Sequence, residues 1–76
     1  MPRPSRNQAR VRLNLEMTEQ VRAQLEELRD LTQADSMTEV IRRALAVYDF
    51  LWNEKEDGAT TIVRTKDGKE REVLLL

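Results

Sequence analysis

The sequence predicts a small, mainly α-helical domain with short β segments. Residues 10–17 alternate apolar and polar side chains, which is the pattern of a β-strand with one buried face. Two helix-length patterns follow at residues 18–33 and 36–53, and a β-hairpin pattern occupies residues 58–76. Because helices follow it directly, the first strand has no partner nearby in the chain. We expect it to pair antiparallel with the same strand of a second copy, which makes the fold an intertwined homodimer.

The first strand divides its side chains between two faces. The apolar face consists of Val11, Leu13, Leu15 and Met17, and the polar face carries Arg12, Asn14 and Glu16. In a pair of such strands, the apolar faces lie on the helices and the polar faces form one exposed ribbon. A two-stranded ribbon fits the major groove of double-stranded DNA, where Arg bonds guanine, Asn bonds adenine and Glu accepts from cytosine. The three polar residues are therefore candidate base-reading residues, and Glu16 has the alternative of pairing with an Arg.

The starts of both helices have recognisable caps. Thr18 is the expected N-cap of the first helix, which ends near Gln33. The sequence Ser36-Met37-Thr38-Glu39 predicts a capping box, in which Ser36 caps the second helix and Glu39 reaches back to the backbone of the cap. The second helix runs to about Asn53, and residues 54–58 are expected to form a polar helix end and a loop.

The start of the second helix is also a candidate phosphate site. Free N–H groups and the positive end of the helix dipole can hold an anion without any side-chain charge. The candidate phosphate-contacting residues are Ser36, Met37 and Thr38, together with Arg3, Arg6 and Arg10 of the basic N-terminal region. We expect Arg42 and Arg43, one turn further along, to be solvated.

The second helix carries an unusually wide apolar stripe. Its two rows are Val40, Ala44, Val47, Leu51 and Ile41, Leu45, Tyr48, Trp52. One short helix and one strand would not cover this width, so the stripe also predicts a second copy. The expected dimer core contains Leu13, Leu15, Met17, Val40, Ile41, Ala44, Leu45 and Tyr48. Phe50 lies off the stripe and needs separate cover.

Composition narrows the classes of function. The 76 residues include neither Cys nor His, which excludes disulfides, thiolate metal sites and thiol catalysis and removes the usual general base. We therefore expect no enzyme activity, cofactor or metal. The net charge is −1, but residues 1–12 carry +4 and the remainder −5, so a positive field surrounds the first strand. No membrane-length apolar run or signal peptide appears, so a cytoplasmic protein is expected.

The C-terminal segment predicts a β-hairpin around Asp67-Gly68. A two-residue turn would set Arg64 opposite Arg71, whereas a three-residue loop would pair Arg64 with Glu70, and the sequence leaves both registers open. We expect the hairpin to pack on the helices over Phe50. For residues 73–76 we favour a buried last strand over the alternative of an exposed apolar tag that proteases or partners recognise. It is an accessory segment that could extend the dimer, bind a ligand, join dimers side by side or dock a protein partner.

From Arg10 to about Trp52 the chain resembles the ribbon–helix–helix family of MetJ/Arc/CopG-type repressors. The resemblance is carried by the alternating strand Arg12-Leu13-Asn14-Leu15-Glu16-Met17, the helix start Thr18-Glu19, the cap Ser36-Met37-Thr38-Glu39 and the run Val40-Ile41-Arg42-Arg43-Ala44-Leu45. It implies an obligate dimer, base contacts from Arg12, Asn14 and Glu16, and a phosphate held at Ser36–Thr38. The chain departs from the family at Ala34-Asp35, where members often have Gly, and at the acidic Glu16. Nickel sensing does not carry over, because its His and Cys ligands are missing.

The expected function is that of a sequence-specific DNA-binding transcriptional regulator, a repressor, with dimers bound to adjacent half-sites. Residues 1–9 would be a flexible basic arm, residues 10–54 the DNA-binding and dimerisation domain, and residues 58–76 the accessory hairpin. One alternative is the antitoxin of a toxin–antitoxin pair that represses its own operon, with the hairpin segment holding the toxin. A second is a dimeric protein-interaction module that does not read DNA.

Overall fold

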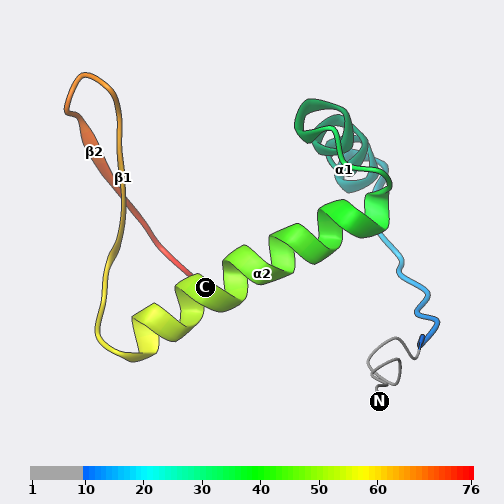
Figure 1. Ribbon diagram of the computed structural model, residues 1–76, viewed down its shortest axis with the longest axis horizontal. Coiled ribbons are helices and arrows are strands. Elements are labelled where there is room, and N and C mark those ends of the chain that lie inside the picture. The colour runs from blue at the N-terminus through cyan, green and yellow to red at the C-terminus, as the bar shows by residue number, and fades with distance from the viewer. Residues whose placement is uncertain (1–9) are drawn as a thin grey trace, which may run out of the picture.

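A computed structural model describes residues 10–76 of the chain. It contains α1 (Glu19–Thr32), α2 (Met37–Glu56), β1 (Thr61–Arg64) and β2 (Glu70–Val73). The long helix α2 carries α1 at one end and the β1–β2 hairpin at the other (Figure 1). The fold is therefore mainly helical with one short antiparallel sheet, as the sequence predicts. The interpretations placed on residues 1–9, including Arg3 and Arg6, lie outside the described residues.

Both helices start where the sequence predicts. The Thr18 hydroxyl accepts a hydrogen bond from the Val21 backbone N–H at 3.1 Å, and the Ser36 hydroxyl accepts one from the Glu39 N–H at 3.1 Å. These bonds satisfy backbone donors that a helix start otherwise leaves free. The second half of the expected capping box is wrong, because the Glu39 carboxylate lies against Arg42 and Arg43 instead of the cap. Two guanidinium groups three and four residues ahead outcompete a single backbone N–H.

The helix α1 ends in a left-handed residue that is not glycine. Gln33 has φ 57° and ψ 36°, and it is the one non-glycine residue with positive φ in the described part of the chain. The Ala34 N–H donates to the Arg29 carbonyl at 2.9 Å, and the Gln33 N–H donates to the Asp30 carbonyl at 3.3 Å. This is a Schellman motif, whose left-handed position glycine usually fills. The helix end is thus formed correctly but at a steric cost.

The helix α2 ends in the same motif with the usual residue. Gly58 has φ 94°, its N–H donates to the Lys55 carbonyl at 2.9 Å, and the Ala59 N–H donates to the Glu54 carbonyl at 2.9 Å. The helix therefore extends to Glu56, beyond the end expected near Asn53. Residues 54–56 are the expected polar helix end, because Glu and Lys are good helix formers and the terminating glycine comes only at position 58.

The hairpin adopts the register of the three-residue loop. Arg64 pairs with Glu70 and Thr61 with Val73, and an ion pair of 2.6 Å joins the Arg64 and Glu70 side chains. Gly68 has φ 92°, which supplies the left-handed residue that closes a turn of this length. The alternative register would place Arg64 opposite Arg71, and like charges directly opposite each other destabilise a strand pair.

The C-terminal residues leave the sheet at Val73, so the expected buried strand over residues 73–76 is wrong beyond its first residue. Leu74 and Leu76 are exposed, and only Leu75 is half-buried. In the observed register, residues 75 and 76 would pair with Ala59 and Gly58. The N–H groups of those two residues already bond the last carbonyls of α2, so the strand cannot continue.

The expected packing of the hairpin over Phe50 is also wrong, since Phe50 is 60% exposed. The end of the chain lies instead on a neighbouring side of α2. There the Tyr48 hydroxyl donates to the Leu76 carbonyl at 2.7 Å, and the Lys55 ammonium donates to the Leu75 carbonyl at 3.1 Å. Backbone carbonyls that have left the sheet find donors on this side, and Phe50 offers none.

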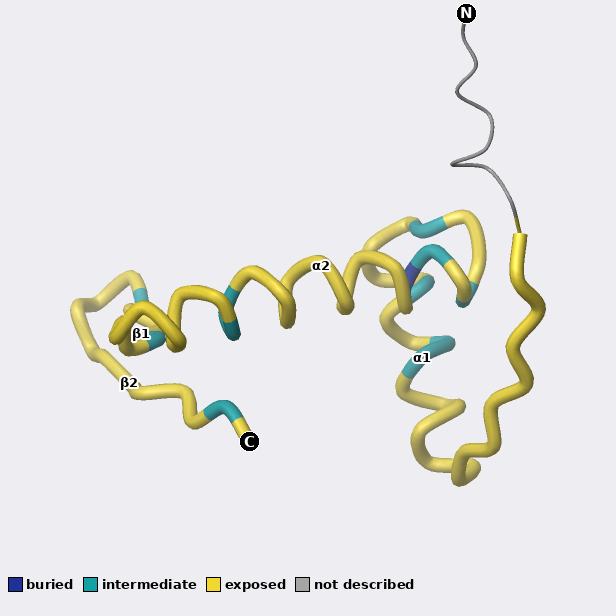
Figure 2. The backbone as a smooth tube through the Cα atoms, turned by 90° about the horizontal axis from the view of Figure 1, so that it is seen from below, coloured by how far each residue is buried: buried dark blue, intermediate teal, exposed yellow. Residues whose placement is uncertain are grey.

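A single chain has almost no core of its own. Val40, where the two helices meet, is the one buried residue among those described, at 5% exposure (Figure 2). The chain exposes 7276 Å², whereas a folded monomer of 8.9 kDa exposes about 4,800 Å². Its radius of gyration is 16.4 Å, compared with about 11 Å for a compact domain of this length. Most of its apolar side chains thus remain uncovered.

The Gln33 conformation gives a direct stability test. Gln33→Gly removes the left-handed strain and should raise the free energy of unfolding by about 0.5–1 kcal/mol, despite the greater freedom of glycine in the unfolded chain. Urea unfolding at a fixed protein concentration measures the change. The neighbouring variant Ala34→Gly is the control and should stabilise nothing, because Ala34 does not have a positive φ. Equal stabilisation by both variants would contradict this account of the helix end.

The hairpin turn gives a pH test. The hydroxyl of Thr65, and then the Lys69 N–H, hydrogen-bond the Asp67 carboxylate and hold its pKa below the ordinary value of 3.8. A depressed pKa means that the carboxylate stabilises the turn above pH 3.8, and that this contribution is lost as the pH falls through the folded-state pKa. The Lys69 amide resonance should therefore titrate below 3.8, and Thr65→Val should move its midpoint upward. A midpoint unchanged by that substitution would contradict the assignment.

Candidate nucleic-acid interface

Residues 10–17 lead into α1 as an extended segment that is assigned to no strand. The apolar side chains on one face are open to solvent: Leu13 is 75% exposed and Leu15 is 55% exposed. On the other face, Arg12, Asn14 and Glu16 are exposed. Within residues 10–76, none of these three side chains makes a hydrogen bond or an ion pair. Both the backbone and the polar face are therefore available to an external partner.

The expected phosphate site lies at the start of α2, next to its N-cap Ser36. The Ser36 hydroxyl already serves Glu39, and the Val40 N–H donates to the Ser36 carbonyl at 3.2 Å. In the described part of the chain, the N–H groups of Met37 and Thr38 have no acceptor. Thr38 is exposed and Met37 is half-buried, so this helix end can present two donors and a positive dipole to an anion.

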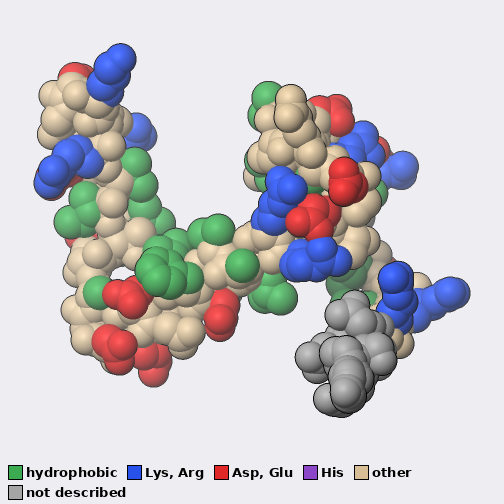
Figure 3. Space-filling view, in the orientation of Figure 1, with side chains coloured by type: hydrophobic (Ala, Val, Ile, Leu, Met, Phe, Trp, Pro, Cys, Tyr) green, Lys and Arg blue, Asp and Glu red, His purple; other side chains and the backbone are tan. Residues whose placement is uncertain are grey.

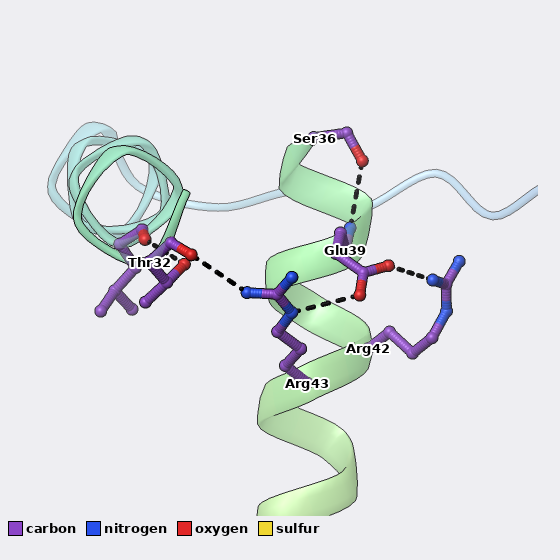
Figure 4. A network of polar contacts seen from close by, with 6 residues as sticks. Thr32, Ser36, Glu39, Arg42 and Arg43 are labelled. Carbon is purple, nitrogen blue, oxygen red and sulfur yellow. Dashed lines mark hydrogen bonds and ion pairs between the residues drawn. The ribbon is translucent and has the colours of Figure 1, made fainter. Parts of the chain in front are cut away.

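A network of polar contacts joins the start of α2 to the end of α1 (Figure 4). The two carboxylate oxygens of Glu39 bind Arg42 and Arg43, the latter at 3.1 Å. The Arg43 guanidinium also donates to the Thr32 backbone carbonyl at 3.3 Å. The expectation that both arginines are merely solvated is therefore wrong for Arg43, which bridges the two helices. The cluster of Glu39, Arg42 and Arg43 has a net charge of +1, and Asp35 directly before the N-cap offsets it.

Sequence reasoning missed the contact between Arg43 and Thr32, although two features point to it. The last carbonyls of a helix lack partners within the helix, and Thr32 is the final residue of α1. The Arg43 guanidinium, four residues after Glu39, is held by that carboxylate and has further N–H groups that can donate to another acceptor. The bridge fixes how α2 leaves the turn, and so how its N-terminus is presented.

The residues expected in a dimer core occupy two different environments. Val40 is buried between the helices of its own chain, whereas the others are exposed. The exposed members are Leu13, Leu15, Met17, Ile41, Ala44, Leu45 and Tyr48. Figure 3 shows hydrophobic side chains along the surface of α2. Ile41, Leu45 and Tyr48 follow the spacing of one helix face, so they form a continuous apolar row.

The described residues hold no group of three or more acidic, His or Cys side chains that could bind a metal. Neither α1 nor α2 has the length and hydropathy that crossing a membrane requires. Comparison of the chain with models of protein families, with curated proteins and with solved structures finds no match.

The Arg43 bridge can be tested against its neighbour. Arg43→Ala removes the bond between the helices and should lower the free energy of unfolding by about 1 kcal/mol. Arg42→Ala removes only a solvent-exposed pair with the same carboxylate, and should cost less than about 0.5 kcal/mol. Chemical unfolding of both variants at equal protein concentration makes the comparison. Equal losses would show that the bond to Thr32 contributes nothing to stability.

Proposed function

We propose that the protein is a dimeric, sequence-specific DNA-binding repressor. In this proposal, residues 10–17 of two copies pair antiparallel and insert their polar faces into the major groove. One observation carries the proposal. An alternating segment has an unpaired backbone, uncovered apolar side chains on one face, and unpartnered Arg12, Asn14 and Glu16 on the other. The unpaired backbone and the uncovered apolar face call for a partner strand, and the polar face is free to contact a polar ligand.

The need for a second copy has independent support in α2. Its row of Ile41, Leu45 and Tyr48 is exposed, although apolar rows of this kind normally face a core. The surface in excess of a compact monomer is about 2,500 Å² per chain, or about 5,000 Å² for two chains, which lies at the upper end of the total area that obligate homodimers bury. Pairing through the ribbon and α2 would cover both apolar surfaces in one step.

The polar contacts divide between reading bases and holding the backbone of DNA. In the major groove, Arg12 is suited to guanine and Asn14 to adenine, and each good pair contributes about 1–3 kcal/mol of discrimination. Glu16 is suited to the amino group of cytosine. The free N–H groups of Met37 and Thr38 are suited to a phosphate, which positions the protein without carrying sequence information.

The folded hairpin favours a repressor with an accessory piece over an antitoxin. In the antitoxin alternative, the C-terminal segment wraps around a toxin, which favours a chain that orders only on binding. Here the segment is already paired in one register and is closed by a Gly68 turn. The remaining alternative, a dimeric module that does not read DNA, is distinguished by the binding experiment below.

Salt-dependent binding to duplex DNA tests the proposal. Binding through several phosphates should weaken steeply with salt, with a log–log slope of about −0.9 per phosphate neutralised. Electrophoretic or fluorescence assays with duplexes selected from a random pool supply the affinities. A protein that dimerises but retains no duplex at low salt would be the interaction module instead.

A single substitution then locates the reading surface. Asn14→Ala should lower the preference for the selected duplex over random DNA by about 1–3 kcal/mol, while the salt slope stays unchanged. Asn53→Ala is the matched control, because Asn53 is exposed near the far end of α2 and should leave both quantities alone. Unchanged specificity in the Asn14 variant would place base reading on another surface.

A further inference from the structure

The hairpin and α2 enclose a hollow that neither fills. We call it the notch, and its walls are the side of α2 that carries Tyr48 and Trp52 and the hairpin face that carries Val63 and Val73. At its base is a cavity of about 170 Å³, lined by residues that include Lys55, Thr61, Val73 and Leu75. Figure 3 shows hydrophobic side chains both on the hairpin and along α2.

The strand register fixes which hairpin side chains share a face, and burial and the cavity lining indicate which face is turned toward α2. Directly opposed residues of an antiparallel pair share a face, so Thr61, Val63, Arg71 and Val73 lie together. Thr61 and Thr65 on this face are half-buried. Thr61 and Val73 line the cavity beside Lys55 of α2, together with Glu72 from the other face. The opposite face carries Ile62, the Arg64–Glu70 ion pair and Glu72, all of them exposed.

The hairpin is held over α2 at both of its ends. On one side the chain enters β1 directly from the Gly58 helix end. On the other side, Tyr48 and Lys55 bind the carbonyls of Leu76 and Leu75. The Lys55 ammonium also lies 4.6 Å from the centre of the Trp52 ring, and that ring lies 6.1 Å from the ring of Tyr48. These contacts tie the end of the chain, and with it the hairpin, to α2.

Both walls of the notch carry apolar side chains that are still uncovered. Val63 is 48% exposed on the hairpin side, and Leu45 is 64% exposed on α2. The α2 wall is continuous with the row of Ile41, Leu45 and Tyr48 that the proposed dimer buries. The two surfaces therefore form one apolar region that bends from the helix onto the hairpin.

We propose that the notch receives α2 of a second copy, so that the hairpin of each chain clasps the helix of the other. The proposal rests on the dimer of the proposed function and assigns the C-terminal hairpin to its interface. A two-fold dimer needs a self-complementary surface, and here the same α2 is both a wall of the notch and the apolar ridge that fits it. The outward hairpin face carries charges and stays in water, so it does not join dimers side by side.

Charge complementarity supports this occupant. Beside Leu45 on α2 lie Arg42, which is already paired with Glu39, and Asp49. Asp49 is therefore the acidic group available there, and Arg71 is the charged residue on the inner face of the strand pair. Within residues 10–76, neither side chain has an ion-pair partner. In the proposed dimer, Arg71 of one chain can pair with Asp49 on the α2 that enters its notch.

Two substitutions on opposite faces of β1 test the proposal in the full-length chain. Val63→Lys places a charge on the inner face, and Ile62→Lys places one on the outer face; the two wild-type residues are 48% and 53% exposed. Sedimentation equilibrium should give a dimer dissociation constant at least about tenfold higher for the Val63 variant, because an unpaired charge is costly to bury. The Ile62 variant should stay within about threefold of the wild type, a difference of less than about 0.7 kcal/mol.

The outcomes separate this proposal from the one it rests on. A wild-type chain that is monomeric at all concentrations overturns the dimer and the clasp together. A wild-type dimer that binds DNA, with equal dissociation constants for the two variants, overturns the clasp alone.

A measurement on the unaltered protein covers the case in which Val63→Lys fails to fold. Trp52 is the single tryptophan of the chain, and it lies between Tyr48 and Lys55 on the α2 wall of the notch. Acrylamide should quench its fluorescence less in the dimer than in the monomer obtained by dilution. Equal quenching in both states would mean that no second copy enters the notch, and would overturn the proposal.

Discussion

The structure depends on one constraint: a single chain cannot cover its own apolar surface. Val40 is the only residue buried among those described, although the chain carries apolar rows on the segment 10–17, on α2 and on the hairpin. Each such side chain gains about 1.5–3 kcal/mol when it is fully buried, and a chain of 76 residues needs most of that gain to offset its conformational entropy. The proposed ribbon, the packing of α2 and the clasp by the hairpin all follow from this deficit.

The helix α2 connects the proposed DNA-facing end of the molecule with the hairpin proposed to take part in the dimer interface. Its first turn offers free N–H groups and is fixed to α1 by the bond between Arg43 and the Thr32 carbonyl. Its last turns carry Tyr48 and Lys55, which bind the end of the chain and position the hairpin. A helix of this length spans about 30 Å, so the proposed DNA-facing end and the hairpin are well separated. Changes at the hairpin should therefore affect assembly before they affect base reading.

Local chemistry explains why some features were predictable from sequence. Thr18 and Ser36 cap the helices as expected, because an N-cap is decided by a few adjacent residues. The hairpin forms around Asp67-Gly68 for the same reason.

Other features of the fold depend on competition between interaction partners that are distant in the fold or in the sequence. The Glu39 carboxylate binds the guanidinium groups of Arg42 and Arg43 instead of the cap. Residues 74–76 leave the sheet because the N–H groups of the facing backbone bond the last carbonyls of α2. Phe50 stayed uncovered because the end of the chain docked beside Tyr48. The pairing of residues 10–17 stays a prediction, since it requires a second chain.

The most direct test of this account is an isotope-filtered NMR experiment on mixed labelled and unlabelled chains, which detects only contacts between copies. The account predicts intermolecular contacts between backbone protons within residues 10–17, together with contacts from the Leu13 and Leu15 methyl groups to the partner's helices. A sample that yields no intermolecular signal, with residues 10–17 solvent-exposed at every protein concentration, would contradict it.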